Sequence, residues 1–263
     1  MATTNKTFII AEAALTWLHG GLEAAYRSIR AAKECGADAW KTQWTSDPVE
    51  MSRRRTGGDR GAGGPGVASI RFVEMASKYG RLAWDPAWLP LLKAECDRVG
   101  VEFLCTTFIP QDVETMGKYV KRFKVSAFES EDMGHLSAHG SKPVIVSVNP
   151  GKRKPVGLPG ASFLWCISQY PAPPESLELS RLHHQDGLRP WDGFSDHTTS
   201  VLTGAVAVGA GARIIEKHVR LHDTPESDPD YGHSLICDIN SPPMEEIRFK
   251  QYVRFIREAE RML

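Results

Sequence analysis

Two histidines in this sequence stand directly after short apolar segments, where a parallel-stranded protein carries its reactive groups. His197 follows residues 192–195, and His218 follows residues 212–217. If these segments are neighbouring strands, the two imidazoles lie side by side. Neutral imidazoles so placed suit a borderline divalent metal that keeps positions open for water or substrate. Glu12 ends the first apolar segment and becomes the next neighbour if the strands close into a barrel. The spacing favours an open metal site, and the alternative for each histidine is a hydrogen-bonded surface or core role.

Two lysines extend this set of strand-end groups. Lys41 and Lys124 lie on the second and fourth segments and would face one cavity. With nearby serine hydroxyls they suit a small dianion, such as a phosphate ester that also carries a carboxylate. The remaining segments end in Ser147, in Ser168 and in the pair Ser195 and Asp196, which we expect among the substrate-binding groups. A lone strand-end lysine often reaches solvent, but convergence of polar groups from every segment on one face favours a functional site.

Alternating apolar and amphipathic stretches predict the elements that position these groups. We expect strands at Thr7–Ala13, Ala37–Gln43, Glu102–Thr106, Phe123–Ala127, Pro143–Val148, Ser162–Cys166, Asp192–Ser195 and Ala212–Lys217. We expect helices at Leu22–Cys35, Arg71–Lys78, Trp88–Val99, Gln111–Tyr119, Pro174–His183, Ser200–Gly209 and Met244–Leu263. Repeated strand–helix units over 263 residues predict a single domain, an α/β (β/α)8 TIM barrel. The rival is a doubly wound open sheet, whose usual glycine-rich first turn is missing here.

Two stretches interrupt this pattern. Residues 149–161 hold three prolines and three glycines, which exclude a regular helix between the fifth and sixth strands. The strand surface left uncovered there could pack against a partner subunit, so a homo-oligomer is one expectation. Residues 53–67 are rich in glycine and predict a flexible surface loop. That loop lacks the preceding strand and following helix of a phosphate-binding glycine motif.

Composition excludes several classes of protein. Lys plus Arg and Asp plus Glu each number 32, so there is none of the basic excess typical of nucleic-acid binding. No apolar run is long enough for a membrane span, so no membrane partner is expected. The 5 cysteines are scattered, without a CxxC pair. They predict reduced thiols in a cytoplasmic protein, not a disulfide framework or a zinc site.

Seven segments together resemble the N-acetylneuraminate (sialic acid) synthase family. They occur in the order Ile10–Ala13, Gly36–Gln43, Phe123–Glu129, Lys142–Ser147, Tyr170–Glu175, Gly193–Thr198 and Ile215–His218. The Ser-Asp-His-Thr, Glu-Lys-His and Tyr-Pro-Ala-Pro-Pro-Glu runs are the specific ones. The resemblance covers nearly the whole chain.

The resemblance implies a (β/α)8 barrel that condenses phosphoenolpyruvate with an N-acetylated amino sugar, such as N-acetylmannosamine. The product is a 2-keto-3-deoxy nonulosonic acid, phosphate is released, and Mn or Mg assists. The metal ligands would be His197 and His218. By the same resemblance, phosphoenolpyruvate would be bound by Lys41, Lys124, Ser147 and Ser195. The sugar side would be lined by Gln43, Thr106, Phe108 and Tyr170. Three carboxylates would contact the sugar or transfer protons: Glu12, Glu129 and Asp230.

The sequence departs from the family in ways that keep other functions open. Ala127 stands where the family has a serine, and the hydroxyl has moved to Ser126. Members typically continue into an antifreeze-like domain that hands an arginine to the partner's sugar site, whereas the resemblance here covers the barrel domain only. One alternative is therefore a degenerate barrel that binds a sugar or a protein without turnover. The other is a Schiff-base aldolase with Lys41 or Lys124 as nucleophile.

Overall fold

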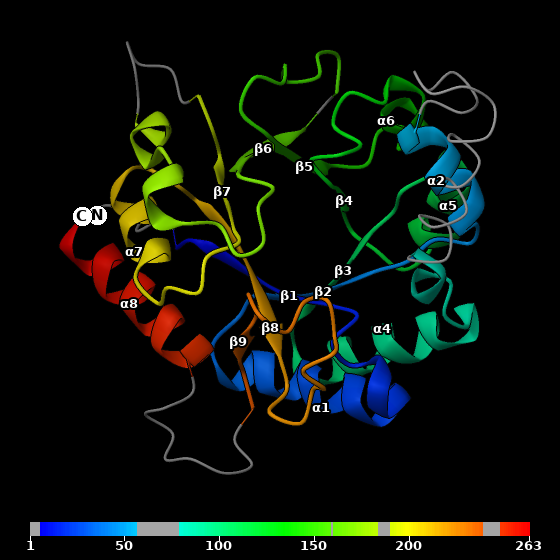
Figure 1. Ribbon diagram of the computed structural model, residues 1–263, viewed down its shortest axis with the longest axis horizontal. Coiled ribbons are helices and arrows are strands. Elements are labelled where there is room, and N and C mark those ends of the chain that lie inside the picture. The colour runs from blue at the N-terminus through cyan, green and yellow to red at the C-terminus, as the bar shows by residue number, and fades with distance from the viewer. Residues whose placement is uncertain (1–5, 57–78, 159, 184–189, 239–247) are drawn as a thin grey trace.

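Eight parallel strands close into a barrel in the part of the chain that this computed structural model describes, residues 6–56, 79–158, 160–183, 190–238 and 248–263 (Figure 1). The strands follow chain order, and the first pairs with the eighth. They are β1 (Phe8–Ala14), β2 (Ala39–Gln43), β3 (Glu102–Thr106), β4 (Phe123–Val125), β5 (Val144–Val148), β6 (Ser162–Cys166), β7 (Gly193–Asp196) and β8 (Ile214–Arg220). The expected TIM barrel is confirmed, and closure through β1 and β8 excludes the open sheet.

Helices surround the barrel on most sides. They are α1 (Gly21–Glu34), α2 (Pro48–Thr56), α4 (Leu89–Val99), α5 (Pro110–Gly117), α6 (Met133–Ala138), α7 (Thr203–Gly209) and α8 (Arg248–Met262). Short 3-10 turns occupy Leu18–Gly20, Gly80–Leu82, Pro86–Trp88, Pro174–Ser176 and Leu179–Leu182. Figure 1 shows loops, not helices, beside β5 and β6. Among the described residues, none of the helices combines the length and the apolar character needed to cross a membrane.

Two of the helices that the structure contains were not expected from the sequence. α2 begins behind Asp47, whose carboxylate accepts the backbone N–H groups of Val49 and Glu50 at 2.9 Å each. It runs to Thr56, so the first four residues of the expected glycine-rich loop are helical. α6 is capped by Asp132, which accepts from the His135 N–H at 3.0 Å, and at six residues it is too short to show a periodic pattern.

One expected helix is wrong. Residues 174–183 form two separate 3-10 turns, because Glu178 between them has a left-handed backbone (φ 47°) that breaks a continuous helix. The expected helix at 71–78 and residues 57–67 of the glycine-rich loop lie outside the described residues.

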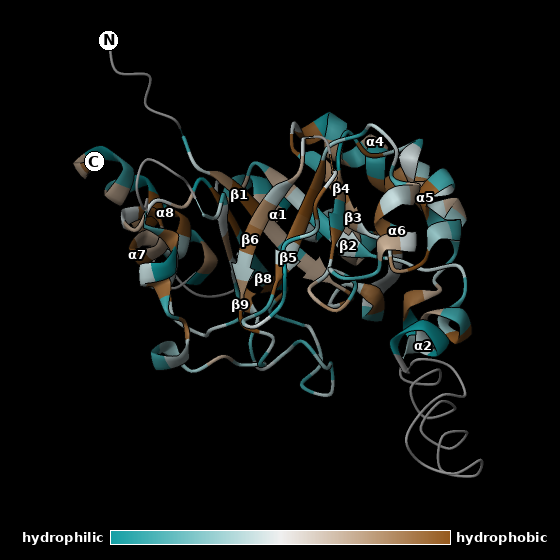
Figure 2. Cartoon of the chain, turned by 90° about the horizontal axis from the view of Figure 1, so that it is seen from above, coloured by the Kyte–Doolittle hydropathy of each residue, from teal (hydrophilic) through white to brown (hydrophobic). Residues whose placement is uncertain are grey.

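Side chains inside the barrel form an apolar layer below a polar one. Ile10, Ala39, Leu104, Ile145 and Leu164 make a separate buried cluster within the barrel. Because side chains on a strand alternate between its two faces, the next inward residue lies two positions further along each strand. Those next positions carry the polar groups described below. The outward side chains of the same strands pack under the helices, and Figure 2 shows the hydrophobic colouring concentrated along the strands.

Gly193 at the start of β7 is required by close packing. A Cβ placed there would stand 1.9 Å from the Ile214 carbonyl oxygen of β8. We predict that Gly193→Ala lowers the free energy of unfolding by about 1–3 kcal/mol or more, measured by urea denaturation. Gly209→Ala is the matched control, since no described atom lies within 4 Å of the added Cβ. That change in a helix should be neutral or stabilise by about 0.5–1 kcal/mol. Equal stability of the two variants would contradict the packing argument.

Candidate active site

An inner cavity lies at the carboxyl ends of the strands, above the apolar layer. Its lining comes from seven of the eight strands and the residues just after them: Lys41, Gln43, Thr106, Lys124, Ser126, Ala127, Phe128, Ser147, Cys166, Tyr170, Ser195, His197, Glu216 and His218. Most of these residues occupy strand positions whose side chains point into the barrel. The expectation that both lysines face one cavity is confirmed.

Four buried charges form a chain across this cavity. Lys41 pairs with Glu12, its cross-strand neighbour in the β1–β2 register, and its Nζ lies 3.9 Å from Glu216 Oε1. Lys124 Nζ lies 3.4 Å from the second Glu216 oxygen. All four side chains are at most 6% exposed. Each charge is therefore balanced by a neighbour, as burial requires.

The environment shifts the pKa values of these groups in different directions. Burial raises the pKa of Glu12, although Lys41 opposes this. Burial also favours a low pKa for Lys41, but Glu12 and Glu216 outweigh it and the pKa rises. Burial lowers the pKa of Lys124, which has only Glu216 as its main counter-charge. For Glu216, burial is outweighed by the two lysines, so the pKa falls. Lys41 is thus held as an ammonium and Glu216 as a carboxylate.

Hydroxyl groups complete the lining of the inner cavity. Lys41 Nζ donates to Thr106 Oγ1 at 2.7 Å, and Lys124 Nζ donates to Ser147 Oγ at 2.9 Å. Ser195 is 2% exposed and lines the same cavity. Two ammonium groups beside three hydroxyls can bind a small ligand that carries a phosphate or a carboxylate.

Three imidazoles surround the Tyr170 ring above this layer. The ring centroids of His197, His233 and His218 lie 4.2, 5.0 and 6.0 Å from that of Tyr170. His197 Nδ1 donates to the Ile167 carbonyl oxygen at 2.7 Å, which leaves Nε2 as the unprotonated nitrogen of the neutral ring. Burial lowers the pKa of His197 to about 4 and that of His218 well below its ordinary value. Both rings are therefore neutral at pH 7, the form in which imidazole binds a metal.

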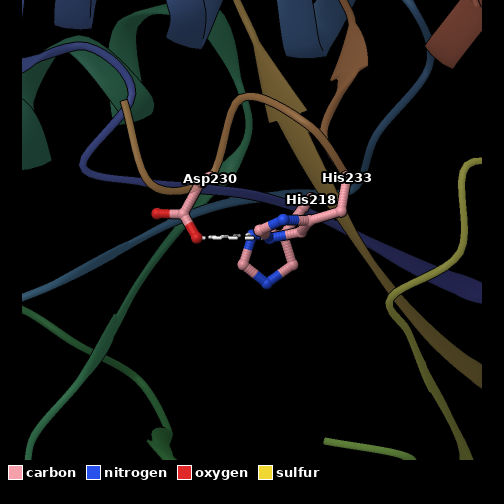
Figure 3. A group of neighbouring side chains, drawn as sticks. All are labelled: His218, Asp230 and His233. Atoms are coloured by element: carbon pink, nitrogen blue, oxygen red, sulfur yellow. Dashed lines mark ion pairs between the residues drawn. The ribbon is translucent and has the colours of Figure 1, made fainter. Parts of the chain in front are cut away.

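His218, Asp230 and His233 bring their donor atoms together (Figure 3). Asp230 Oδ1 lies 3.2 Å from His233 Nε2 and 3.9 Å from His218 Nδ1. Figure 3 shows the carboxylate pointing at both rings, with His218 on β8 and the other two residues on the loop that follows. Neither nitrogen has a hydrogen-bond partner among the described residues, although both are buried. A divalent cation fits this set of nitrogen and oxygen donors.

An outer cavity of about 400 Å³ opens beside the histidines. Phe108, Tyr170, Ser168, Gln43 and Asp230, all expected in the site, line it. Its wall also contains Leu15, Met51, Tyr79, Leu82 and Phe128, and two arginines, Arg55 and Arg81. It shares Gln43, Ser126, Phe128, Tyr170 and His218 with the inner cavity, so the two are continuous.

Two expected carboxylates lie behind the walls of these cavities. Glu12 is fully buried beneath Lys41 and accepts from Gln43 Nε2 at 3.1 Å. Glu129 accepts from Arg55 Nε at 2.6 Å and from the Ser126 hydroxyl, so it fixes two side chains that do line the outer cavity. Both act on the site through the groups that they hold.

Asp196 is placed differently from the expectation. It follows the inward Ser195, so its side chain points outward, where Lys217 Nζ lies 3.0 Å and the Tyr252 hydroxyl 2.8 Å away. It also accepts from the Thr198 N–H at 2.8 Å. Asp196 lines neither cavity, and its assignment to substrate binding is corrected to a structural role under α7 and α8.

Three residues of the site were missed from the sequence. The sequence alone assigns no role to Glu216, although alternation along β8 turns its side chain into the barrel, where it lies between the two lysines. Arg55 fell in the stretch assigned to the glycine-rich loop, and its contact with Glu129 spans 74 residues. His233 stands three residues after Asp230, and only that spacing could have drawn attention to it.

The chain matches the NeuB family over residues 28–154 and 158–263. It is 31% identical over 281 residues to a pseudaminic acid synthase of Campylobacter jejuni, covering 99% of this chain and 76% of that protein. An N,N'-diacetyllegionaminic acid synthase of Legionella pneumophila is 30% identical over 274 residues, covering 97% and 73%. The crystal structure of a sialic acid synthetase from Leptospira borgpetersenii in complex with citrate shares the fold, with TM-score 0.77, 22% identity and coverage of 98% and 85%.

The structural role of Asp196 can be tested by its effect on stability. Asp196→Asn leaves the Lys217 ammonium buried without its counter-charge and should cost about 3–5 kcal/mol of unfolding free energy in urea denaturation. Asp223→Asn is the matched control, because Asp223 forms its 2.6 Å pair with Arg27 at the surface, where such pairs contribute about 1 kcal/mol or less. A loss for Asp196→Asn no larger than that of the control would mean that this buried network does not support the fold.

Proposed function

The chain belongs to the NeuB family of acid synthases, and from this membership and the geometry above we propose that it condenses phosphoenolpyruvate with an N-acetylated amino sugar. The proposed acceptor resembles N-acetylmannosamine. Carbon 3 of phosphoenolpyruvate attacks the open-chain aldehyde, and the aldehyde oxygen gains a proton. Water adds at carbon 2, and the C–O bond to phosphate breaks. The products are a 2-keto-3-deoxy nonulosonic acid and inorganic phosphate.

Phosphoenolpyruvate is assigned to the inner cavity. Lys41 and Lys124 supply charge to its phosphate and carboxylate, and Ser147 and Ser195 donate hydrogen bonds. The two lysines face two carboxylates, Glu12 and Glu216, so the cavity carries little net positive charge before the substrate binds. A substrate with two anionic groups is then held best when further positive charge is present nearby.

A divalent ion, Mn or Mg, is proposed to bind beside Tyr170, with His197 and His218 as ligands. The neutral state of both rings and the unprotonated Nε2 of His197 support this assignment. When bound, such an ion supplies Lewis-acid polarisation of the acceptor carbonyl.

The acceptor sugar is assigned to the outer cavity. Gln43 and Tyr170 line both cavities, Thr106 lines the inner cavity, and Phe108 lines the outer one. Asp230 can accept hydrogen bonds from sugar hydroxyls or hold a proton during the reaction. Glu129 orients Arg55 toward the same cavity, and Glu12 fixes Lys41. The two buried carboxylates are therefore proposed as positioning groups for the side chains that touch substrate.

The observation that best supports this proposal is that the inner cavity, which contains two lysines, is continuous with the outer cavity, which is lined by histidines and aromatic side chains. The test is phosphate release from phosphoenolpyruvate with Mn²⁺ and a panel of N-acetylated amino sugars, with and without EDTA. We expect release that requires both a sugar and the metal. Binding of phosphoenolpyruvate without release on any sugar would favour the degenerate barrel. Covalent trapping of a keto acid by borohydride at a lysine would favour the aldolase.

A lysine substitution tests the assignment of the inner cavity. Lys124→Gln should raise the dissociation constant of phosphoenolpyruvate about 10- to 100-fold, the size of one lost charged hydrogen bond, in a calorimetric titration. Lys154→Gln is the matched control, because Lys154 lies over the Trp191 ring and lines neither cavity. The same affinity for both variants would place the substrate elsewhere.

A further inference from the structure

The cluster of His218, Asp230 and His233 contains more donor atoms than the two-histidine assignment uses. His233 is 3% exposed and His218 is 5% exposed, yet the Nε2 of one and the Nδ1 of the other lack hydrogen-bond partners among the described residues. A buried nitrogen without a partner costs about 1–3 kcal/mol. Two such atoms aimed at one carboxylate oxygen therefore need a common explanation.

Donor spacing fits a shared cation. The three donor atoms lie within 4.8 Å of one another, and Asp230 Oδ1 lies 3.2 Å from His233 Nε2 and 3.9 Å from His218 Nδ1. Ligands about 2.1 Å from one metal ion stand roughly 3–3.5 Å apart when they are neighbours in its coordination sphere. A carboxylate oxygen can accept from two N–H groups, but 3.9 Å is too long for a hydrogen bond. A direct histidine–carboxylate hydrogen bond therefore accounts for the His233 nitrogen at most.

The loop that carries Asp230 and His233 is fixed from several sides. It ends in β9 (Leu235–Ile236), which pairs with β8 through Val219 and Arg220. Arg81 binds Asp228 at 2.6 Å, and Asp228 in turn accepts the Asp230 N–H at 3.0 Å. The donors are thus preorganised, as a metal site requires.

We propose that His233 is a further imidazole ligand of the divalent metal beside His218, and that Asp230 adds a carboxylate oxygen to the same centre. This inference rests on the metal-assisted synthase function proposed above. Imidazole nitrogens favour borderline ions such as Co²⁺ and Zn²⁺ over Mg²⁺, which prefers oxygen ligands, and the Asp230 oxygen makes the set acceptable to the harder Mn²⁺. The same residues therefore select the class of metal.

The experiment measures metal binding without substrate or turnover. Free Mn²⁺ is followed by its EPR signal during titration of the full chain, and Co²⁺ binding is followed by visible absorption. His233→Ala and His233→Gln should each weaken Mn²⁺ binding about 10-fold or more and change the Co²⁺ spectrum. His218→Ala is the positive control. His19→Ala is the matched negative control, since His19 binds the Thr16 carbonyl at 2.8 Å and lines neither cavity.

The outcomes separate this inference from the proposed function. Weaker binding in both His233 variants, with melting temperatures close to that of the wild type, supports the inference even if no sugar is turned over. Wild-type affinity in a His233 variant, with binding lost in His218→Ala, overturns it and leaves the synthase proposal intact. A wild-type chain that binds neither ion overturns it together with the metal assignment, while phosphate release in EDTA would still establish the condensation. Mg²⁺ that displaces Mn²⁺ at equal concentration would refute the claimed selectivity.

Discussion

The burial of four ionisable side chains inside the barrel constrains everything around them. Glu12, Lys41, Glu216 and Lys124 are nearly inaccessible to water, and a lone charge there would cost several kcal/mol. Their pairing requires β1 and β8 to be neighbours, because Lys41 on β2 reaches Glu216 across β1. An open sheet would separate its first and last strands and leave these charges unbalanced. Barrel closure and the charge pattern of the site are thus one requirement.

This charge chain also distinguishes its two lysines. Lys41 is fixed by Glu12 and Thr106, and its pKa is raised, so it serves as a permanent positive charge. Burial lowers the pKa of Lys124, the direction that a Schiff-base nucleophile needs. However, Lys124 Nζ also donates to Ser147 and to the Val125 carbonyl, and it faces Glu216. These acceptors stabilise the ammonium form, which fits anion binding better than nucleophilic attack.

The sequence predicted what depends on short-range periodicity. The expected strands and strand-end groups follow from the alternation of apolar and amphipathic stretches along the chain. The apolar layer, which was not predicted from the sequence, follows from the period of two residues within each strand. The same rule, applied strictly, would have turned Asp196 outward and Glu216 inward. The short helix α6 was not predicted because its six residues are too few to show a helical repeat of apolar positions. Arg55 was not predicted because its role depends on a contact between distant segments of the chain. His233 was not predicted because its position depends on the path of a loop that β9 fixes. Neither feature leaves a periodic signal in the sequence.

The two cavities therefore have different origins in the chain. Strands supply most of the inner one, where the barrel's register sets the position of the strand side chains. Connecting segments build much of the outer one: α2 supplies Arg55, residues 79–82 supply Tyr79 and Arg81, and the loop after β8 supplies Asp230 and His233. Loops change more readily than barrel strands because fewer backbone contacts fix them. A barrel of this design can thus keep the chemistry of its inner cavity constant while the loops alter what the outer cavity binds.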